Sequence, residues 1–130
     1  MESPLSGAMW LIEEGQVKEG MEMIRTEMKR DLDTSDVVSG YNNLCVGHLA
    51  LKEYAKALEQ CQTATKIRGN MWQSHNNMGN ARLAMDDVVG AIANYQAALA
   101  LKPDSATIQG NLALAQQYLA EDDAKKKAGK

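Results

Sequence analysis

Three short stretches recur at a fixed spacing and decide the fold. They read Tyr-Asn-Asn-Leu-Cys-Val-Gly (41–47), His-Asn-Asn-Met-Gly-Asn-Ala (75–81) and Gln-Gly-Asn-Leu-Ala-Leu-Ala (109–115). Their shared asparagines Asn43, Asn77 and Asn111 lie 34 residues apart, and each precedes a large apolar residue. A fixed period of this size is typical of stacked-repeat proteins, in which each unit buries its apolar face against its neighbours.

The apolar residues around these stretches recur with the spacing of a helix. The unit 38–71 contains two such faces, one formed by Tyr41, Leu44, Cys45 and His48, the other by Tyr54, Ala57, Leu58, Cys61 and Ala64. The unit 72–105 repeats both faces, and Asp86-Asp87 separates them. Acidic residues at this break suit the positive N-terminal end of a second helix. We therefore expect a helical hairpin in each unit.

The rest of the chain is predicted to extend this pattern within one domain, 1–120. The segment 1–34 is predicted to be a degenerate repeat that turns at Gly15, in register with the later units if about three residues are inserted near 35–37. The segment 106–120 is predicted to be a capping helix. The polar tail 121–130 is expected to fray or to extend that helix without packing. This gives about seven helices, as three hairpins and a cap.

The two central units resemble the tetratricopeptide repeat, whose pattern is W-x2-L-G-x2-Y in the first helix, then A-x3-F, Ala and a closing Pro. The unit 72–105 matches this pattern at Met78-Gly79, Ala91, Tyr95, Ala98 and Pro103. The unit 38–71 departs from it, with Cys45 at the glycine position and Gly69 at the proline position. The resemblance implies an all-α, right-handed superhelical solenoid of antiparallel helix pairs.

The resemblance also implies that the first helix of each unit lines a concave groove. The candidate groove residues are Asn42, Asn43, Val46, Leu49, Asn76, Asn77, Asn80, Leu83, Asn111, Leu114 and Tyr118. A carboxamide carries donors and an acceptor, so a row of asparagines can pair with the backbone of an extended peptide, while apolar neighbours supply side-chain pockets. The alternative is that the asparagines face water or bond across the hairpin, and that the apolar residues pack locally.

The predicted groove carries no Lys or Arg, since the basic residues fall on turns and second helices. A neutral or apolar peptide segment of another protein therefore suits it better than an acidic chain end. The predicted function is non-catalytic protein–protein recognition, as a scaffold or peptide-binding module. The alternative is a self-associating structural module that forms a homodimer through its solenoid ends.

Other function classes find little support in the sequence. A net charge of −3 argues against nucleic-acid binding, and no apolar run is long enough for membrane insertion. No catalytic motif is present, so we expect neither enzymatic activity nor a cofactor. The compartment is left open: cytoplasmic by default, or the bacterial periplasm if a signal peptide has been removed.

Two cysteines and two histidines raise the alternative of a metal or redox site. Cys45, His48, Cys61 and His75 lack the paired spacing of structural zinc sites and occupy packing positions of the repeat, so no metal is predicted. The sequence does not determine whether Cys45 and Cys61 are free or paired. A redox or metal-sensing protein is a third function class, and it would require thiol reactivity or bound zinc.

Overall fold

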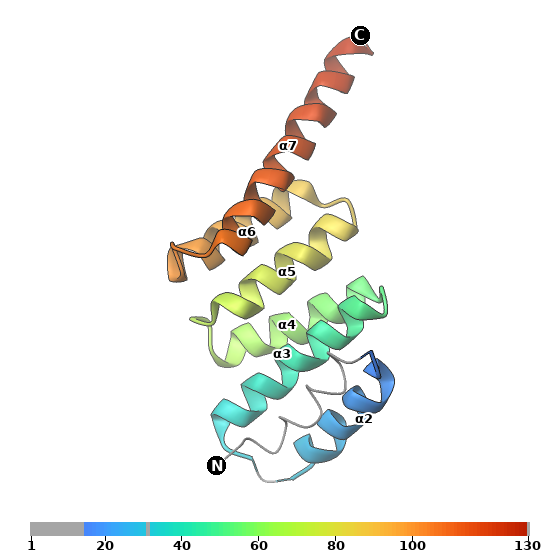
Figure 1. The fold of residues 1–130 in the computed structure, drawn as a ribbon, viewed down its shortest axis with the longest axis vertical. Coiled ribbons are helices and arrows are strands. Elements are labelled where there is room, and N and C mark those ends of the chain that lie inside the picture. The colour runs from blue at the N-terminus through green and yellow to red at the C-terminus, as the bar shows by residue number, and fades with distance from the viewer. Residues whose placement is uncertain (1–14, 31, 130) are drawn as a thin grey trace.

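The computed structural model describes residues 15–30 and 32–129. Its helices are α2 (Val17–Met28), α3 (Thr34–Ala50), α4 (Tyr54–Ile67), α5 (Trp72–Ala84), α6 (Val88–Leu101) and α7 (Ala106–Ala128). They follow one another along a single stack, with the N-terminal helices at one end and α7 at the other (Figure 1). The helix expected upstream of Gly15 lies outside the described residues. The predicted all-α solenoid of helix pairs is confirmed.

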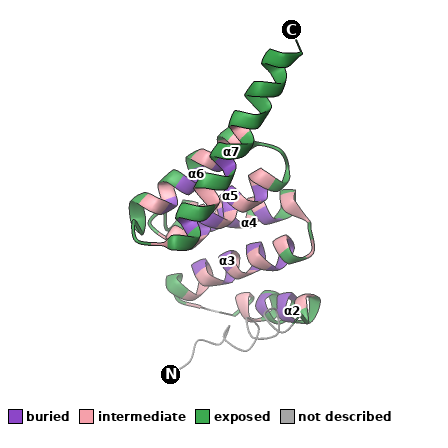
Figure 2. Ribbon diagram, turned by 45° about the horizontal axis from the view of Figure 1, so that its top comes forward, coloured by how far each residue is buried: buried purple, intermediate pink, exposed green. Residues whose placement is uncertain are grey.

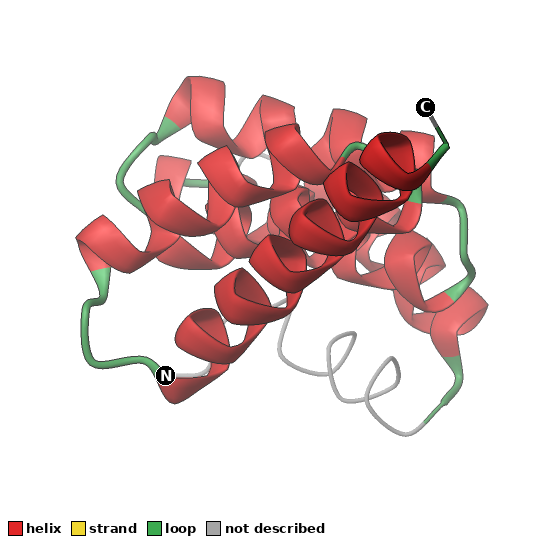
Figure 3. Cartoon of the chain, turned by 90° about the horizontal axis from the view of Figure 1, so that it is seen from above, coloured by secondary structure: helices red, strands yellow, loops and turns green. Residues whose placement is uncertain are grey.

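The first helices of the units lie next to one another. Helix α5 contacts both α3 and α7, in addition to the contacts between consecutive helices. Seen along the stack, the helices form two layers connected by short loops (Figure 3). Side chains on the same face of α3, α5 and α7 are therefore placed on one continuous surface.

The turns and helix starts repeat with the sequence. Lys52 and Asp86, 34 positions apart, have φ values of 61° and 65° and occupy the turn between the first and second helix of each unit. The Asp87 side chain accepts a hydrogen bond from the Gly90 backbone N–H at 3.0 Å, which caps α6. Ser105 caps α7 in the same way through Ile108. These caps satisfy backbone donors that a helix start leaves unpaired.

Small residues allow the helices of each pair to approach closely. Ala57 and Ala64 on α4, and their counterparts Ala91 and Ala98 on α6, are fully buried. A Cβ added at Gly79 would lie 2.5 Å from the ring of Tyr95, so the tyrosine ring packs directly on the backbone of α5. A large side chain at these positions would have to displace a helix.

The C-terminal helix is longer than the predicted cap. It continues to Ala128, and its residues beyond Leu119 are exposed (Figure 2). Ala113, the counterpart of Cys45 and Gly79, is also exposed. In the described part of the chain no second helix packs against this face of α7, so the face is exposed.

Candidate functional site

Two adjoining pockets lie on the surface formed by the first helices. The first pocket, about 480 Å³, is lined by Ser39, Asn42, Asn43, Val46, Met71, Trp72, Gln73, Asn76, Asn77 and Thr107. The second pocket, about 380 Å³, is lined by Asn80, Leu83, Ala84, Tyr95, Asn111, Leu114 and Tyr118. Asn77 and Asn80 are three residues apart on α5, so the pockets meet on one helix face. We call the two together the groove.

The eleven predicted groove residues fall into three sets. Asn43, Val46, Asn77, Asn80, Leu83 and Asn111 are half-buried pocket walls, while Leu114 and Tyr118 are more exposed, at 41% and 43%. Asn42 and Asn76 also line the first pocket but are only 8% and 7% exposed. Leu49 lines neither pocket and packs against the core around Cys45.

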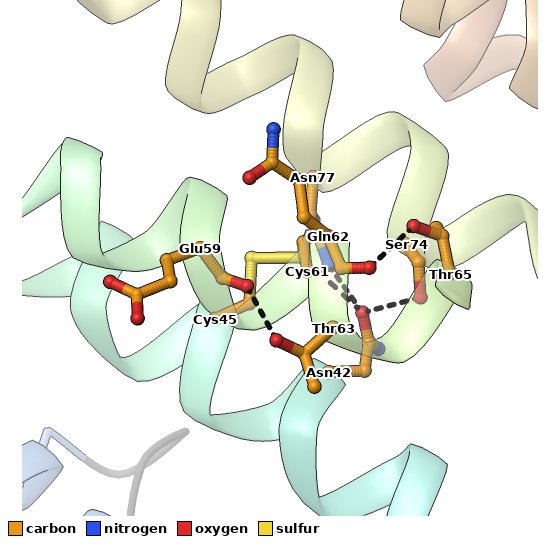
Figure 4. Close-up of a disulfide and its surroundings, with 9 residues drawn as sticks. All are labelled: Asn42, Cys45, Glu59, Cys61, Gln62, Thr63, Thr65, Ser74 and Asn77. Atoms are coloured by element: carbon orange, nitrogen blue, oxygen red, sulfur yellow. Dashed lines mark hydrogen bonds between the residues drawn. A yellow bond between two sulfur atoms is a disulfide. The ribbon is translucent and has the colours of Figure 1, made fainter. Parts of the chain in front are cut away.

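Asn42 forms the centre of a hydrogen-bond network between two units. Its Oδ1 accepts from the Ser74 hydroxyl at 3.2 Å and from Asn77 Nδ2 at 3.3 Å (Figure 4). The sulfur of Cys61 lies 3.7 Å from the same oxygen. Because that sulfur belongs to a disulfide, it has no proton to donate. The network links α3 to α5, and buried amides of this kind are stable only when their partners are present.

The next pair of units repeats this contact. Asn111 on α7 donates through Nδ2 to Oδ1 of Asn76 on α5 at 3.1 Å. Asn42 and Asn76 thus act as acceptors one unit before Asn77 and Asn111, which act as donors. These four asparagines therefore bond between units, whereas the alternative stated from the sequence was a bond across the hairpin. Asn77 and Asn111 use Nδ2 in these bonds, so the carboxamide oxygen of each has no protein donor among the described residues and lies on the groove side.

Asn80 is held by a residue of the second helix. The Tyr95 hydroxyl donates to Asn80 Oδ1 at 2.6 Å, and the Tyr95 side chain is 1% exposed. Burial raises the pKa of Tyr95 to about 12, so the hydroxyl keeps its proton at neutral pH. The Asn80 Nδ2 donates to no group in the described part of the chain, and it belongs to the wall of the second pocket.

The groove is electrically neutral in the part of the chain that the structure describes, since only uncharged residues line its two pockets. The Lys102 ammonium lies 4.6 Å from the centre of the Trp72 ring, in a cation–π contact. Arg82 donates to Asn94 Oδ1 at 2.7 Å and lies 3.8 Å from Asp87. Arg82 is therefore engaged within the second hairpin, and Lys102 lies against Trp72, which lines the first pocket.

Cys45 and Cys61 form a disulfide between α3 and α4, which settles the question that the sequence left open. His48 Nδ1 donates to Glu53 at 3.1 Å and keeps the pKa of that carboxyl below its usual value. His75 bonds to the Gly69 carbonyl at 2.7 Å. Among the described residues, no group of His, Cys, Asp and Glu is arranged to hold a metal ion.

Several pocket residues were not predicted from the sequence. Ser39, Gln73 and Thr107 recur every 34 residues, on α3, α5 and α7, and the period itself could have identified them. Met71 precedes α5 and Trp72 begins it, and neither had such a signal. No helix in 15–30 or 32–129 combines the length and apolar character that a membrane span requires.

Comparisons with known proteins bear on the fold of the chain rather than on its groove residues. No family model matches the chain. The chain is 30% identical over 90 residues to human peptidyl-prolyl cis-trans isomerase FKBP4, a match that covers 69% of this chain but 20% of that protein. The chain thus spans about a fifth of the length of such relatives, so their activity is not transferred to it.

Solved structures match the fold over nearly the whole chain. The first TPR domain of human RPAP3 superimposes with a TM-score of 0.84 at 20% identity, covering 92% of both chains. The first TPR of Spaghetti, bound to the HSP90 peptide SRMEEVD, gives a TM-score of 0.81 at 21% identity, covering 88% of this chain and 90% of that one. At such identities the likeness shows the fold alone.

Proposed function

We propose that this chain, which has the tetratricopeptide-repeat fold, is a non-catalytic module that binds a neutral, extended peptide segment of another protein in the groove. The observation that carries the proposal is the pair of adjoining pockets, lined by asparagines and apolar side chains without a charge. Carboxamides can pair with a peptide backbone, and the apolar walls can hold alternate side chains.

The neutrality of the groove determines the class of peptide. A carboxylate that enters it loses hydration, and no lining cation compensates for the loss. The Spaghetti complex contains a peptide with three acidic residues, SRMEEVD, so that protein accommodates acidic side chains. The groove of this chain is better suited to a segment without them and without a free chain end.

The affinity for one short segment is expected to be modest. An extended peptide loses conformational freedom when it binds, and an open groove buries limited area, so we expect a Kd on the order of micromolar. Tighter binding by the complete partner would require contacts outside the groove.

Calorimetry with defined peptides tests this proposal. Nine-residue amidated peptides, selected on the wild-type protein from a random library without charged residues, are compared with SRMEEVD. We expect the selected peptides to bind at least tenfold more tightly than SRMEEVD. Equal or tighter binding of SRMEEVD, or the absence of any neutral binder, would refute the proposal.

A pair of alanine variants locates the binding surface. Asn43 lines the first pocket and its side chain bonds to no other described residue, so Asn43→Ala should weaken peptide binding and leave the melting temperature unchanged. Asn70 is exposed in the turn after α4, outside both pockets, and Asn70→Ala is the matched control with unchanged binding. Equal affinities for the two variants would place the site elsewhere.

Self-association is a second candidate, favoured by the exposed face of α7. A depression of about 540 Å³ between the α5–α6 turn and α7 shares Leu83 and Tyr118 with the second pocket of the groove. It is lined by both acidic residues and lysines, including Asp86, Asp87, Asp122, Lys125 and Lys126. Val89, also in its wall, is 67% exposed. Sedimentation at protein concentrations across the micromolar range tests self-association. A concentration-dependent dimer supports this candidate, and a constant monomer removes it.

A further inference from the structure

Asn77, Asn80 and Asn111 are each held from behind by a hydrogen bond to another helix. We propose that Asn77 and Asn80 recognise the polarity of the bound peptide, that is, the order of its backbone N–H and C=O groups. Asn77 accepts through Oδ1 from a peptide N–H, and Asn80 donates through Nδ2 to the C=O of the same peptide residue. The ligand is an extended segment of a partner protein, recognised by its main chain. This inference rests on the proposed function and adds the atoms that make the contacts.

The orientation of Asn77 follows from its bond to the preceding unit. Its Nδ2 donates to Asn42 Oδ1, which also accepts from the Ser74 hydroxyl. Rotating the Asn77 carboxamide by 180° would bring two oxygens together and leave the buried Asn42 with one donor fewer, a loss that buried polar groups rarely tolerate. With Asn42 in this orientation, the group that Asn77 offers to a ligand is an acceptor.

The orientation of Asn80 is opposite. The Tyr95 hydroxyl donates to its Oδ1 at 2.6 Å, and the Tyr95 ring is fixed against Gly79. The carboxamide oxygen of Asn80 is thus occupied within the protein. The group that remains for a ligand is the NH₂, which is a donor.

The order of these groups matches one side of an extended chain. In an extended segment, the N–H and C=O of one residue point to the same side, and the next N–H on that side belongs to the residue two positions on. Asn77 and Asn80 are three apart on α5, where Cβ atoms are roughly 5–6 Å from each other. Asn111 repeats the arrangement of Asn77 on α7, because its Nδ2 donates to Asn76. The groove therefore presents an acceptor, a donor and an acceptor in turn.

Two variants of equal charge test this polarity. Asn80→Asp retains an acceptor for Tyr95 but removes the donor, and it places an oxygen opposite the peptide C=O. Asn77→Asp retains the outward acceptor but loses the donor to Asn42. Both variants add one negative charge to the groove, so a difference between their peptide affinities reports the polarity of the groove rather than its charge.

Calorimetry with a selected, uncharged, amidated nonapeptide gives the binding readout. We expect Asn80→Asp to weaken binding at least tenfold with little change in melting temperature. Asn77→Asp should weaken binding less than threefold and lower the melting temperature. Equal losses of affinity, or the reverse order, would overturn the polarity while leaving the proposed function standing. If no uncharged peptide binds the wild-type protein, both fail.

The free protein provides a readout without a peptide. In side-chain NMR, the amide protons of Asn77 and Asn111 should exchange with water more slowly than those of Asn80, because one proton of each is held in a bond between units. Slower exchange at Asn80 than at Asn77 would show the opposite orientation and would overturn the inference.

Discussion

The two hairpins α3–α4 and α5–α6 hold their helices together with different chemistry at the same repeat positions. Cys45 and Cys61 form a covalent bond in the first hairpin, and Gly79 and Tyr95 occupy the corresponding positions in the second. A disulfide fixes two helices but contributes no polar group to the surface. The tyrosine packs on the glycine and also reaches Asn80 in the groove.

This difference assigns stability mainly to the first hairpin and recognition mainly to the second. The counterpart of Asn80 in the first hairpin is Val46, which needs no orienting partner. The first hairpin therefore supplies two cross-linked helices, and its Asn42 is a hydrogen-bond acceptor for the next unit. The second hairpin carries the oriented donor of the groove.

The largest expected effect is reduction of the disulfide. Its cysteines are separated by 16 positions, and closing a loop of this size is worth about 3 kcal/mol through the unfolded chain. Dithiothreitol should therefore lower the melting temperature of the wild-type protein. The double variant Cys45→Ala, Cys61→Ala serves as the control, since its melting temperature should not respond to the reductant. A wild-type melt that dithiothreitol leaves unchanged would contradict this assignment of stability to the first hairpin.

A methyl group at Gly79 tests the second hairpin. Its Cβ would lie 2.5 Å from the buried Tyr95 ring, so we expect Gly79→Ala to destabilise the protein by about 1–3 kcal/mol in urea unfolding. Gly110→Ala is the matched control on α7: nothing lies within 4 Å of its added Cβ, and removing a helical glycine should stabilise by about 0.5–1 kcal/mol. If the two variants changed stability alike, the close contact at Gly79 would not limit packing.

The smallest expected effect comes from the Tyr95 hydroxyl. Tyr95→Phe removes the bond to Asn80 and should cost about 1 kcal/mol at neutral pH.

The same substitution has a signature at alkaline pH. Burial raises the pKa of Tyr95 from 10.0 to about 12, so the folded state holds this proton more tightly than the unfolded chain. Its contribution is complete below pH 10 and is lost as the pH rises through 12. Tyr95→Phe should therefore lose less stability between these pH values than the wild type, as measured by chemical denaturation. An identical decline in both proteins would show that the hydroxyl is not buried.

The sequence contained enough to predict the architecture and most of the groove wall. A period of 34 with helical spacing specifies paired helices, and the same period brings Asn43, Asn77 and Asn111 to one surface. The break at Asp86-Asp87 was also predicted, but not that Lys52 and Asp86 adopt positive φ at the turns without being glycine. Their conformation depends on the packed hairpin rather than on local preference.

The orientation of the carboxamides could not be predicted in the same way. Which atom of Asn77 faces the groove depends on Asn42, one unit earlier, and the orientation of Asn80 depends on Tyr95, on another helix. These are contacts between distant residues, and spacing alone does not specify them. The pairing of Cys45 with Cys61 likewise depends on how closely α3 and α4 approach.

The most direct measurement is a chemical-shift map of the labelled protein with a selected, uncharged, amidated nonapeptide. A neutral peptide bound in the groove should produce its largest shifts at the side-chain amides of Asn43, Asn77 and Asn80. Shifts confined to the depression around Asp86, Val89 and Lys125, or no shifts at all, would contradict this account.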